Sequence, residues 1–406
     1  MTAGRRRRIV FAALIALAGT ATAAVAQLPT QAPPAELRSI EIGPLSMTPF
    51  LDIREVGWDD NVFNDPDNPQ RDFTATIIPR VYGLVQIGWT RLTFASAVDF
   101  VYFREFTGER SVNRSAQGRF EVGEGVLRPF VTGSIADTHE RLNAEIDARA
   151  GRRQHSYGGG LLLVVTDRTS LLVSARRSNL AFDDDARYRA VDLHRTMNSR
   201  TDLFEAGLRV ALTPLTTWDV TGGLEYERFE REPRRDADTV RITTGLQFHP
   251  SALISGRASI GYTQFTPADP ELAEYQGLVA QVGLVYALGP TRIEGEVERQ
   301  VRYSFEEQRP YYLTTHARLT ATQQIAGPID VQGTVGRSVL SYRAFGGGDD
   351  ESRQDRMIIY GGGVGFRLVD TARFGVNVEW SQRRSDEQPD RHYDRRRVYA
   401  SLTYGF

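Results

Sequence analysis

The chain has no cysteine among its 406 residues, which excludes disulfide bonds and thiolate metal sites. It has no lysine either, so all 49 basic residues are arginine. A composition bias of the gene is one explanation. The other is that some arginines are pinned in a wet interior, because a guanidinium group holds a fixed hydrogen-bonding geometry better than an ammonium group does.

Long apolar runs are also missing after the N-terminal region. The longest strictly aliphatic run there is only Leu161 to Val165, whereas a membrane-spanning helix needs about 20 apolar residues. A membrane protein without such helices must cross the bilayer as a closed β-barrel. Without the basic run Arg5 to Arg8 the net charge is −6, which speaks against nucleic-acid binding, and the 10% aromatic content speaks against disorder.

Residues that could support catalysis are sparse. The six histidines do not have the spacing of metal ligands. They are His139, His155, His194, His249, His316 and His392. Two Asp–His pairs, Asp137 with His139 and His392 with Asp394, fall where an outer rim is expected, but this spacing is common by chance. We therefore expect no enzyme activity, no catalytic residue, no cofactor and no metal site.

Acidic clusters occur at Asp183 to Asp185 and at Asp349 and Asp350. Such clusters could bind Ca²⁺, or could bridge to lipopolysaccharide phosphates through cations. Solvated loop charge is the favoured interpretation.

The first 26 residues have the three-part pattern of a secretory signal peptide. A basic run, Arg5 to Arg8, precedes a short apolar core, Ile9 to Leu17, and Ala24-Val25-Ala26 is a small-x-small cleavage site. We expect 1–26 to be removed, 27–46 to be a periplasmic lead-in, and 47–406 to form one barrel domain.

The last stretch of the chain alternates with a period of two. Val398, Ala400, Leu402, Tyr404 and Phe406 share one face, which predicts a strand with that face in an apolar medium. The ending resembles the terminal signature that the barrel-assembly machinery reads in bacterial outer-membrane proteins. Leu402, Tyr404 and Phe406 are the predicted assembly signal.

Short turns alternate with longer polar loops along the rest of the chain, which is the layout of an outer-membrane barrel with turns in the periplasm and loops outside. The expected turns are 88–90, 127–129, 166–168, 213–215, 249–251, 288–290, 327–328 and 369–371. The expected loops are 59–71, 107–113, 143–153, 183–199, 231–238, 266–274, 305–309, 345–353 and 384–395. These connections join about 18 antiparallel strands in an up-and-down barrel. Poor alternation from Phe120 to Ile135 leaves 16 as the alternative count.

Charged residues alternate with apolar ones on many of these strands. A mid-membrane arginine on the lipid face would cost about 2–4 kcal/mol, so the charged faces are predicted to point into a water-filled lumen. The predicted pore-lining residues are Asp219, Glu225, Arg241, Arg257, Arg292, Glu294, Glu296, Arg318, Arg367, Arg373 and Glu379. For each of these residues the alternative is a structural role, in which arginine and carboxylate side chains pair across neighbouring strands and only stabilise the wall. Arg299 breaks the pattern, because it falls on an apolar face near the loop end.

Aromatic residues recur eight positions apart on the apolar faces, as in Trp218 and Tyr226 or Phe94 and Tyr102, and Ile254 and Tyr262 have the same spacing. Eight residues of a tilted strand climb roughly 20 Å, close to the ~25 Å apolar band of such barrels. These rings are predicted to form two interfacial girdles.

The segment Ile40-Glu41-Ile42-Gly43-Pro44-Leu45, with Pro49 and Trp58-Asp59-Asp60-Asn61-Val62-Phe63 after it, resembles the opening of the beta-barrel porin-2 family. Trp58 stands where tyrosine is common. The resemblance implies an outer-membrane barrel of the porin type, often associated with exopolysaccharide export loci, and it transfers no catalytic residue.

Together these patterns predict a porin-like barrel for passive passage of small hydrophilic solutes. The alternative is a barrel that serves exopolysaccharide export, or a structural barrel without an open channel. The expected location is the outer membrane. The expected partners are its lipid and lipopolysaccharide, the barrel-assembly machinery, and either small solutes or polysaccharide.

Overall fold

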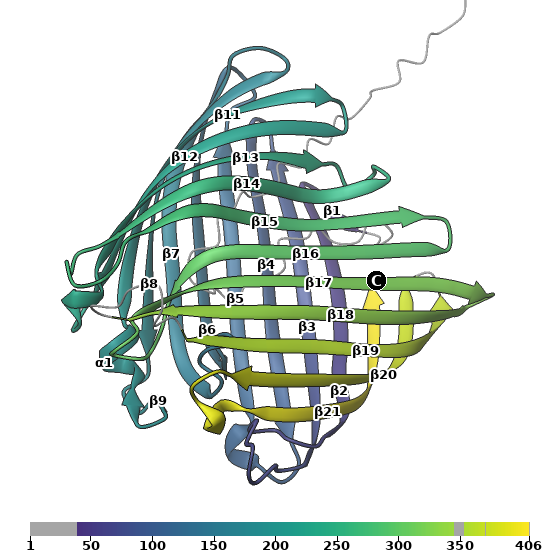
Figure 1. Ribbon diagram of the computed structural model, residues 1–406. Helices are drawn as coiled ribbons and strands as arrows, with labels where there is room; N and C mark the ends of the chain where they lie inside the picture. The colour runs from purple at the N-terminus through teal and green to yellow at the C-terminus, as the bar shows by residue number, and fades with distance from the viewer. Residues whose placement is uncertain (1–38, 345–352, 370, 406) are drawn as a thin grey trace, which may run out of the picture.

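The computed structural model describes residues 39–344, 353–369 and 371–405, which form a closed antiparallel β-barrel (Figure 1). The sheet holds 19 strands, of which the first, β1 (Ile40–Ile42), is a short flap paired with β2. The other 18 strands make the wall. The predicted fold class and the count of 18 are confirmed, and the alternative count of 16 is wrong.

The wall strands follow one another around the barrel in chain order, each paired with the next. They are β2 (Leu45–Asp59), β3 (Asp72–Ile87), β4 (Thr90–Phe103), β5 (Ser111–Val122), β6 (Leu127–Arg141), β7 (Arg149–Val164), β8 (Thr169–Phe182), β11 (Ser199–Thr213), β12 (Thr216–Phe229), β13 (Ala237–Phe248), β14 (Ile254–Pro267), β15 (Tyr275–Leu288), β16 (Thr291–Tyr303), β17 (Tyr311–Ala326), β18 (Ile329–Arg343), β19 (Gln354–Val369), β20 (Ala372–Ser385) and β21 (Tyr393–Gly405).

The two faces of the wall differ as the alternation predicts. On β18, Val331 and Val335 are exposed on the outer face, whereas Asp330, directly before Val331, is fully buried on the inner face. Tyr360 and Trp380 stack on the outer face of neighbouring strands with ring centroids 5.5 Å apart. The apolar outer surface is therefore the surface that contacts lipid, and the charged side chains face inward.

The barrel closes where β2 pairs with β21, from Phe50↔Gly405 to Asp59↔Arg397. Leu402 and Tyr404 of the predicted assembly signal lie in this last strand, and Phe406 lies outside the described residues. The register shifts at Glu55, which has a φ of 58°. This bulge adds local bend and twist at the closing seam.

The tight turns lie at one end of the barrel and the longer loops at the other. Strands reverse at 88–89, 165–168, 214–215, 249–253, 289–290 and 327–328, as predicted. The prediction of a turn at 127–129 is wrong, because the chain turns at 123–126. Gly123 supplies the left-handed φ of 102° that this turn needs. Pro129 is the third residue of β6 and lies one residue before pairing with β5 begins at Phe130, so no β5 partner needs its missing N–H.

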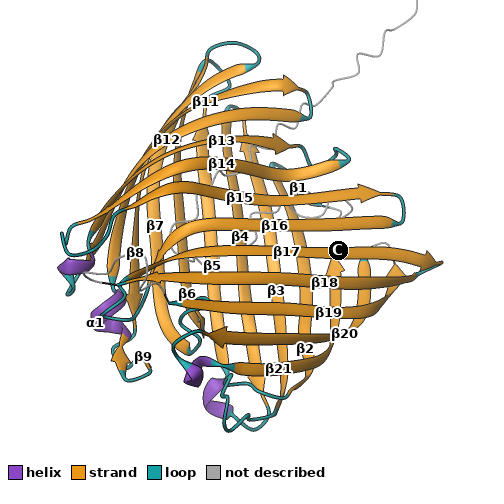
Figure 2. Cartoon of the chain, in the orientation of Figure 1, coloured by secondary structure: helices purple, strands orange, loops and turns teal. Residues whose placement is uncertain are grey.

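The longer loops carry short helices and a small hairpin (Figure 2). The loop between β8 and β11 contains β9 (Arg187–Tyr188), β10 (Val191–Asp192) and α1 (Leu193–Met197). Single 3₁₀ turns are η1 (Thr107–Glu109), η2 (Pro233–Arg235) and η4 (Pro389–Arg391). In the described part of the chain, no helix is long and apolar enough to span a bilayer.

At the N-terminal side, the barrel begins earlier than expected. β2 starts at Leu45 instead of Met47, and β1 occupies Ile40–Ile42 of the expected lead-in. The signal peptide predicted over 1–26 lies outside the described residues.

Candidate permeation pathway

Most of the predicted pore-lining residues pair with one another, either within one strand or between strands that are one to three places apart in the wall. Four pairs account for eight of them: Asp219–Arg257 at 2.6 Å, Glu225–Arg241 at 3.6 Å, Arg292–Glu294 at 2.6 Å and Arg318–Glu379 at 4.0 Å. Glu296 and Arg367 remain exposed at their strand positions. The inner wall is thus a mixed-sign ionic surface, in which acidic and basic side chains lie close together.

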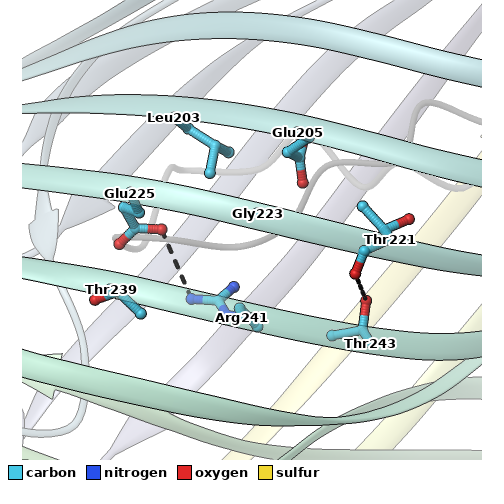
Figure 3. A pocket seen from close by; sticks show the side chains of 8 residues that line it. All are labelled: Leu203, Glu205, Thr221, Gly223, Glu225, Thr239, Arg241 and Thr243. Carbon is cyan, nitrogen blue, oxygen red and sulfur yellow. Dashed lines mark hydrogen bonds and ion pairs between the residues drawn. The ribbon is translucent and has the colours of Figure 1, made fainter.

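Figure 3 shows one patch of this inner wall on β11, β12 and β13. Glu225 and Arg241 point toward each other across two adjacent strands, and Glu205 projects from the third strand. The Thr243 hydroxyl donates to the Thr221 carbonyl at 3.5 Å. Gly223 lies in the same patch, where an added Cβ would be in ordinary contact with Glu205 and Leu203.

Arg373 pairs with a residue that the sequence did not single out. Its guanidinium donates to both carboxylate oxygens of Asp330, at 2.9 and 2.5 Å, across the intervening strand β19. Gly365 of β19 lies beneath the pair. A Cβ at this glycine would lie 2.3 Å from the Arg373 guanidinium and 2.5 Å from the Asp330 carboxylate. The absence of a side chain at Gly365 therefore permits the bridge.

Arg397 links the closing seam to the inner wall. It donates to Glu55 at 2.9 Å on β2 and to Glu379 at 2.5 Å on β20, which are its two neighbouring strands. Glu379 also lies 4.0 Å from Arg318. These groups form a ribbon of alternating charge along the inner face of the seam.

At the loop end, several loops contact one another across the mouth of the barrel. The "loop cap" consists of residues 60–71, 142–148, 183–198, 304–310 and 386–392. Ser304 donates to Glu145 Oε1 at 2.7 Å, and Arg391 donates to the Glu145 carbonyl at 2.6 Å. The hairpins β6–β7 and β16–β17, which carry Glu145 and Ser304, lie almost opposite each other in the ring of strands. The cap therefore spans the opening.

Apolar side chains from three of the cap loops share one buried core. Ile146, Leu193, Met197 and Phe305 are almost completely buried there, together with Phe182 from the end of β8. Burial of this apolar surface stabilises the loops against one another. These three loops therefore form a packed structure at the mouth rather than loose loops.

A buried ionic network joins the cap to the wall. Arg353 and Arg383 are at most 1% exposed, and both pair with Asp355, at 3.2 and 2.5 Å. Arg391 lies 3.1 Å from Glu306 in the same network. Removing one partner of such a network would leave a buried charge without compensation, which is strongly destabilising.

Glu145 is the titratable residue at the centre of the cap. It is fully buried, and this desolvation raises the pKa of its carboxyl to about 7, against the attraction of Arg391 and Arg383. The carboxyl of Glu306 opposes its ionisation as well. Its protonation state therefore changes near neutral pH.

The Asp–His pairs considered from the sequence do not form dyads. The Asp137 carboxylate lies 3.9 Å from Arg153, and the backbone N–H of His139 donates to Asn113 Oδ1. The His392 ring instead contacts the Ser385 carbonyl at 2.8 Å.

Asp184 lies 3.3 Å from the His194 ring, and Asp349 and Asp350 lie outside the described residues. Over the described ranges, no group of acidic and histidine side chains could hold a metal ion.

Sequence reasoning missed the cap. Its key residues, Glu145, Arg353, Arg383 and Arg391, fall in or next to predicted loops, where no periodic pattern marks an inward side chain. The only available signal was the density of arginine near 383–397, which also fits a solvated loop.

A closed wall, an apolar outer belt and an ionic inner face define an outer-membrane β-barrel. Residues 39–406 match the family described as Putative beta-barrel porin 2, and the chain belongs to that family. No curated protein matches it.

Among solved structures, the outer membrane protein OpdK of Pseudomonas aeruginosa is similar, with a TM-score of 0.51 and 9% identity over 89% of this chain and 99% of that one. OccAB2 of Acinetobacter baumannii is similar with a TM-score of 0.48 and 9% identity, over 89% of this chain and 98% of that one. At this identity the likeness to OpdK supports the fold alone.

Proposed function

We propose that this barrel provides passive passage for small hydrophilic solutes across the outer membrane. The single observation that carries the proposal is the continuous ionic inner face of a closed 18-strand wall. A barrel of this strand number encloses an aqueous lumen unless something fills it. The eleven residues predicted from the sequence, with Asp330 and Arg397 added, are the proposed lining.

The loop cap sets the size limit in this proposal. Solutes that reach the lumen must pass between its loops, or the loops must part. Because the lining pairs acid with base around the wall, we expect weak ion selectivity and sorting mainly by size. The family match favours this function over a polysaccharide-export or purely structural barrel.

The location and the assembly partners follow from the same proposal. The chain would be exported through its N-terminal segment and recognised by the barrel-assembly machinery through Leu402, Tyr404 and Phe406. Its outer belt would contact lipid, and its acidic loops would meet lipopolysaccharide phosphates through divalent cations.

Liposome swelling with sugars of increasing size tests the function. Folded, inserted protein should admit small sugars and exclude larger ones. Swelling rates equal to those of empty liposomes for every sugar would contradict the proposal and leave the barrel fold intact.

A further inference from the structure

The ladder between β15 and β16 stops short of the loop ends of both strands. Their ladder ends at Ala280↔Arg299, although β15 extends to Tyr275 and β16 to Tyr303. Each strand remains paired with its other neighbour over this stretch. Figure 1 shows β16 bending away from β15 toward its loop end. The loop-end part of this seam therefore lacks backbone hydrogen bonds between the two strands.

The outer ends of β16 and β17 pack on the inner side of the wall. The Tyr303 ring lies 4.9 Å from the Phe229 ring and 5.9 Å from the Phe265 ring. Both phenylalanines belong to the buried inner faces of β12 and β14. Tyr303 lies on the same face of β16 as Val297. That face contacts lipid at Val297, whereas at Tyr303 it packs against the inner side of the wall. An aromatic cluster thus lies between two layers of strands behind the open seam.

One side chain of β16, Arg299, bonds to β15 beyond the end of the ladder, and Tyr275 shares its acceptor from within β15. Arg299 Nε and the Tyr275 hydroxyl both donate to the Leu278 carbonyl, at 3.3 and 3.2 Å. The Tyr275 ring folds over Gly277, where a Cβ would lie 2.6 Å from the tyrosine oxygen. Arg299 also donates to Thr315 at 2.7 Å. Side chains can turn away by changing rotamer, whereas a backbone ladder opens only as a unit.

The seam between β5 and β6 also ends before its strands do. There, Asn113 Oδ1 accepts the backbone N–H of His139 at 2.7 Å, so a fixed bond follows the last rung. Among the described contacts, no cluster of aromatic side chains from a neighbouring strand packs on the inner side of this seam. The unpaired stretch between β15 and β16 therefore differs from the one between β5 and β6 in having aromatic side chains on its inner side.

The position of this unpaired stretch in the membrane and the side chains around it indicate which molecule it could bind. Leu278 is the register partner of Tyr262, and both are exposed on the outer face at the level of the predicted outer girdle. That level is the boundary between acyl chains and head groups. Leu278 and Val301 are apolar, Arg299 is a cation, and the cluster behind them is aromatic.

We propose that this seam is a side port that admits an amphipathic molecule, with a hydrocarbon tail and an anionic head, from the outer leaflet. The tail enters toward Phe265 and Tyr303, and the head pairs with Arg299. The port goes beyond axial passage of hydrophilic solutes. It also explains why a lone arginine stands on the apolar face of β16, where it otherwise only bonds Leu278 and Thr315.

The port leads toward the loop cap. Tyr303 packs against the buried apolar core of the cap as well as against the aromatic cluster. A tail in the port would therefore lie beside Phe305, which belongs to that core. The lateral route reaches the barrel interior at the level where the cap spans the axial mouth.

Photolabelling in liposomes tests the port. The probe is dodecyl phosphate with a diazirine at the tail end, and labelled residues are mapped by mass spectrometry. We expect label on Phe265 and Tyr303 in addition to the lipid-facing surface. Arg299→Gln should reduce the label at these two residues roughly tenfold, because a charge-assisted contact is lost, whereas Arg299→Lys should retain most of it. Label confined to lipid-facing positions such as Val297, or equal labelling in Arg299→Gln, would overturn the proposal.

A crosslink gives a second test that does not depend on Arg299. The chain has no cysteine, so Leu278→Cys with Val301→Cys can be joined by a short bis-maleimide after folding. Joining should remove the label from Phe265. The matched control joins Ile260→Cys to Ala280→Cys across the fully paired seam between β14 and β15 and should leave the label unchanged. Persistent label after joining Leu278→Cys to Val301→Cys would overturn the port. Because the readout is labelling, it is independent of whether solutes pass along the axis.

Discussion

The Ser304 hydroxyl donates to Glu145 Oε1 at 2.7 Å, and this bond joins loops from nearly opposite sides of the barrel. The same carboxylate lies beside Arg391, whose guanidinium donates to the Glu145 carbonyl. Glu145 thus connects three hairpins that are far apart in the sequence, through its side chain to Ser304 and through its backbone carbonyl to Arg391. The loop cap depends on such bridges, since neighbouring strands cannot hold loops across an opening.

We predict that Glu145→Ala loosens the cap. The change removes an acceptor from the buried Ser304 hydroxyl, which costs about 1–3 kcal/mol when the donor is left unsatisfied. Single-channel recording should show longer or larger open states than in the unaltered protein. Glu124→Ala, in the exposed turn at the opposite end, is the control and should change nothing. Identical traces for Glu145→Ala and the unaltered protein would show that the cap does not limit passage.

The cap should also respond to pH. Burial raises the pKa of Glu145 to about 7, from an ordinary value of 4.5. Between these two pKa values, the Glu145 carboxyl is protonated in the closed cap and ionised in an open loop. Proton binding therefore favours the closed cap. Cap stability should be greatest below about pH 4.5 and should fall as pH rises through about 7.

Hydrogen exchange of the amides in 142–148, corrected for the intrinsic rate, measures this dependence. Exchange should accelerate as pH rises from about 4.5 to about 7 in the unaltered protein and level off above that value. Glu145→Gln keeps a neutral group in place and should flatten the profile. A profile of equal slope in Glu145→Gln would exclude Glu145 as the titrating residue.

Gly365→Val is predicted to destabilise the wall. The new side chain would occupy the space of the Arg373–Asp330 bridge, and Asp330 is fully buried. We expect the free energy of unfolding in detergent to fall by about 2 kcal/mol or more. Gly333→Val is the matched control, because a Cβ there meets nothing within 4 Å. Equal losses in both variants would point to a general cost of replacing strand glycine.

The closing seam should depend on Asp59 and Arg395. Arg395 Nε donates to the two Asp59 oxygens at 2.9 and 3.0 Å, and Arg395 Nη2 contacts the same carboxylate. Asp59→Asn should lower the temperature at which the folded barrel converts to the unfolded band on a semi-native gel. A double-mutant cycle with Arg395→Gln should show coupling between the two sites. Additive effects would mean that the pair does not stabilise closure.

The strand pattern was predictable because lipid and water impose opposite demands on alternate residues. This constraint placed Asp219, Arg257, Glu225 and Arg241 on the inner face from the sequence alone, and the structure brings them together in pairs. Cross-strand pairing follows from register, which the short turns fix.

The loop cap and the Asp330–Arg373 bridge were not predictable in the same way. Asp330 and Arg373 lie two strands apart, and only the small size of Gly365 allows them to meet. Glu145 and Ser304 are 159 positions apart in loops without periodicity. The open seam had one sequence signal, Arg299 on an apolar face, and its meaning depends on where the ladder with β15 ends.

Recording from purified, folded protein in a planar bilayer tests the central claim most directly, namely that the ionic inner face surrounds a water-filled path. The account predicts discrete conductance steps, with a small reversal potential in a salt gradient because the lining mixes acid and base. A bilayer that contains folded, inserted barrels and shows no conductance step would contradict it.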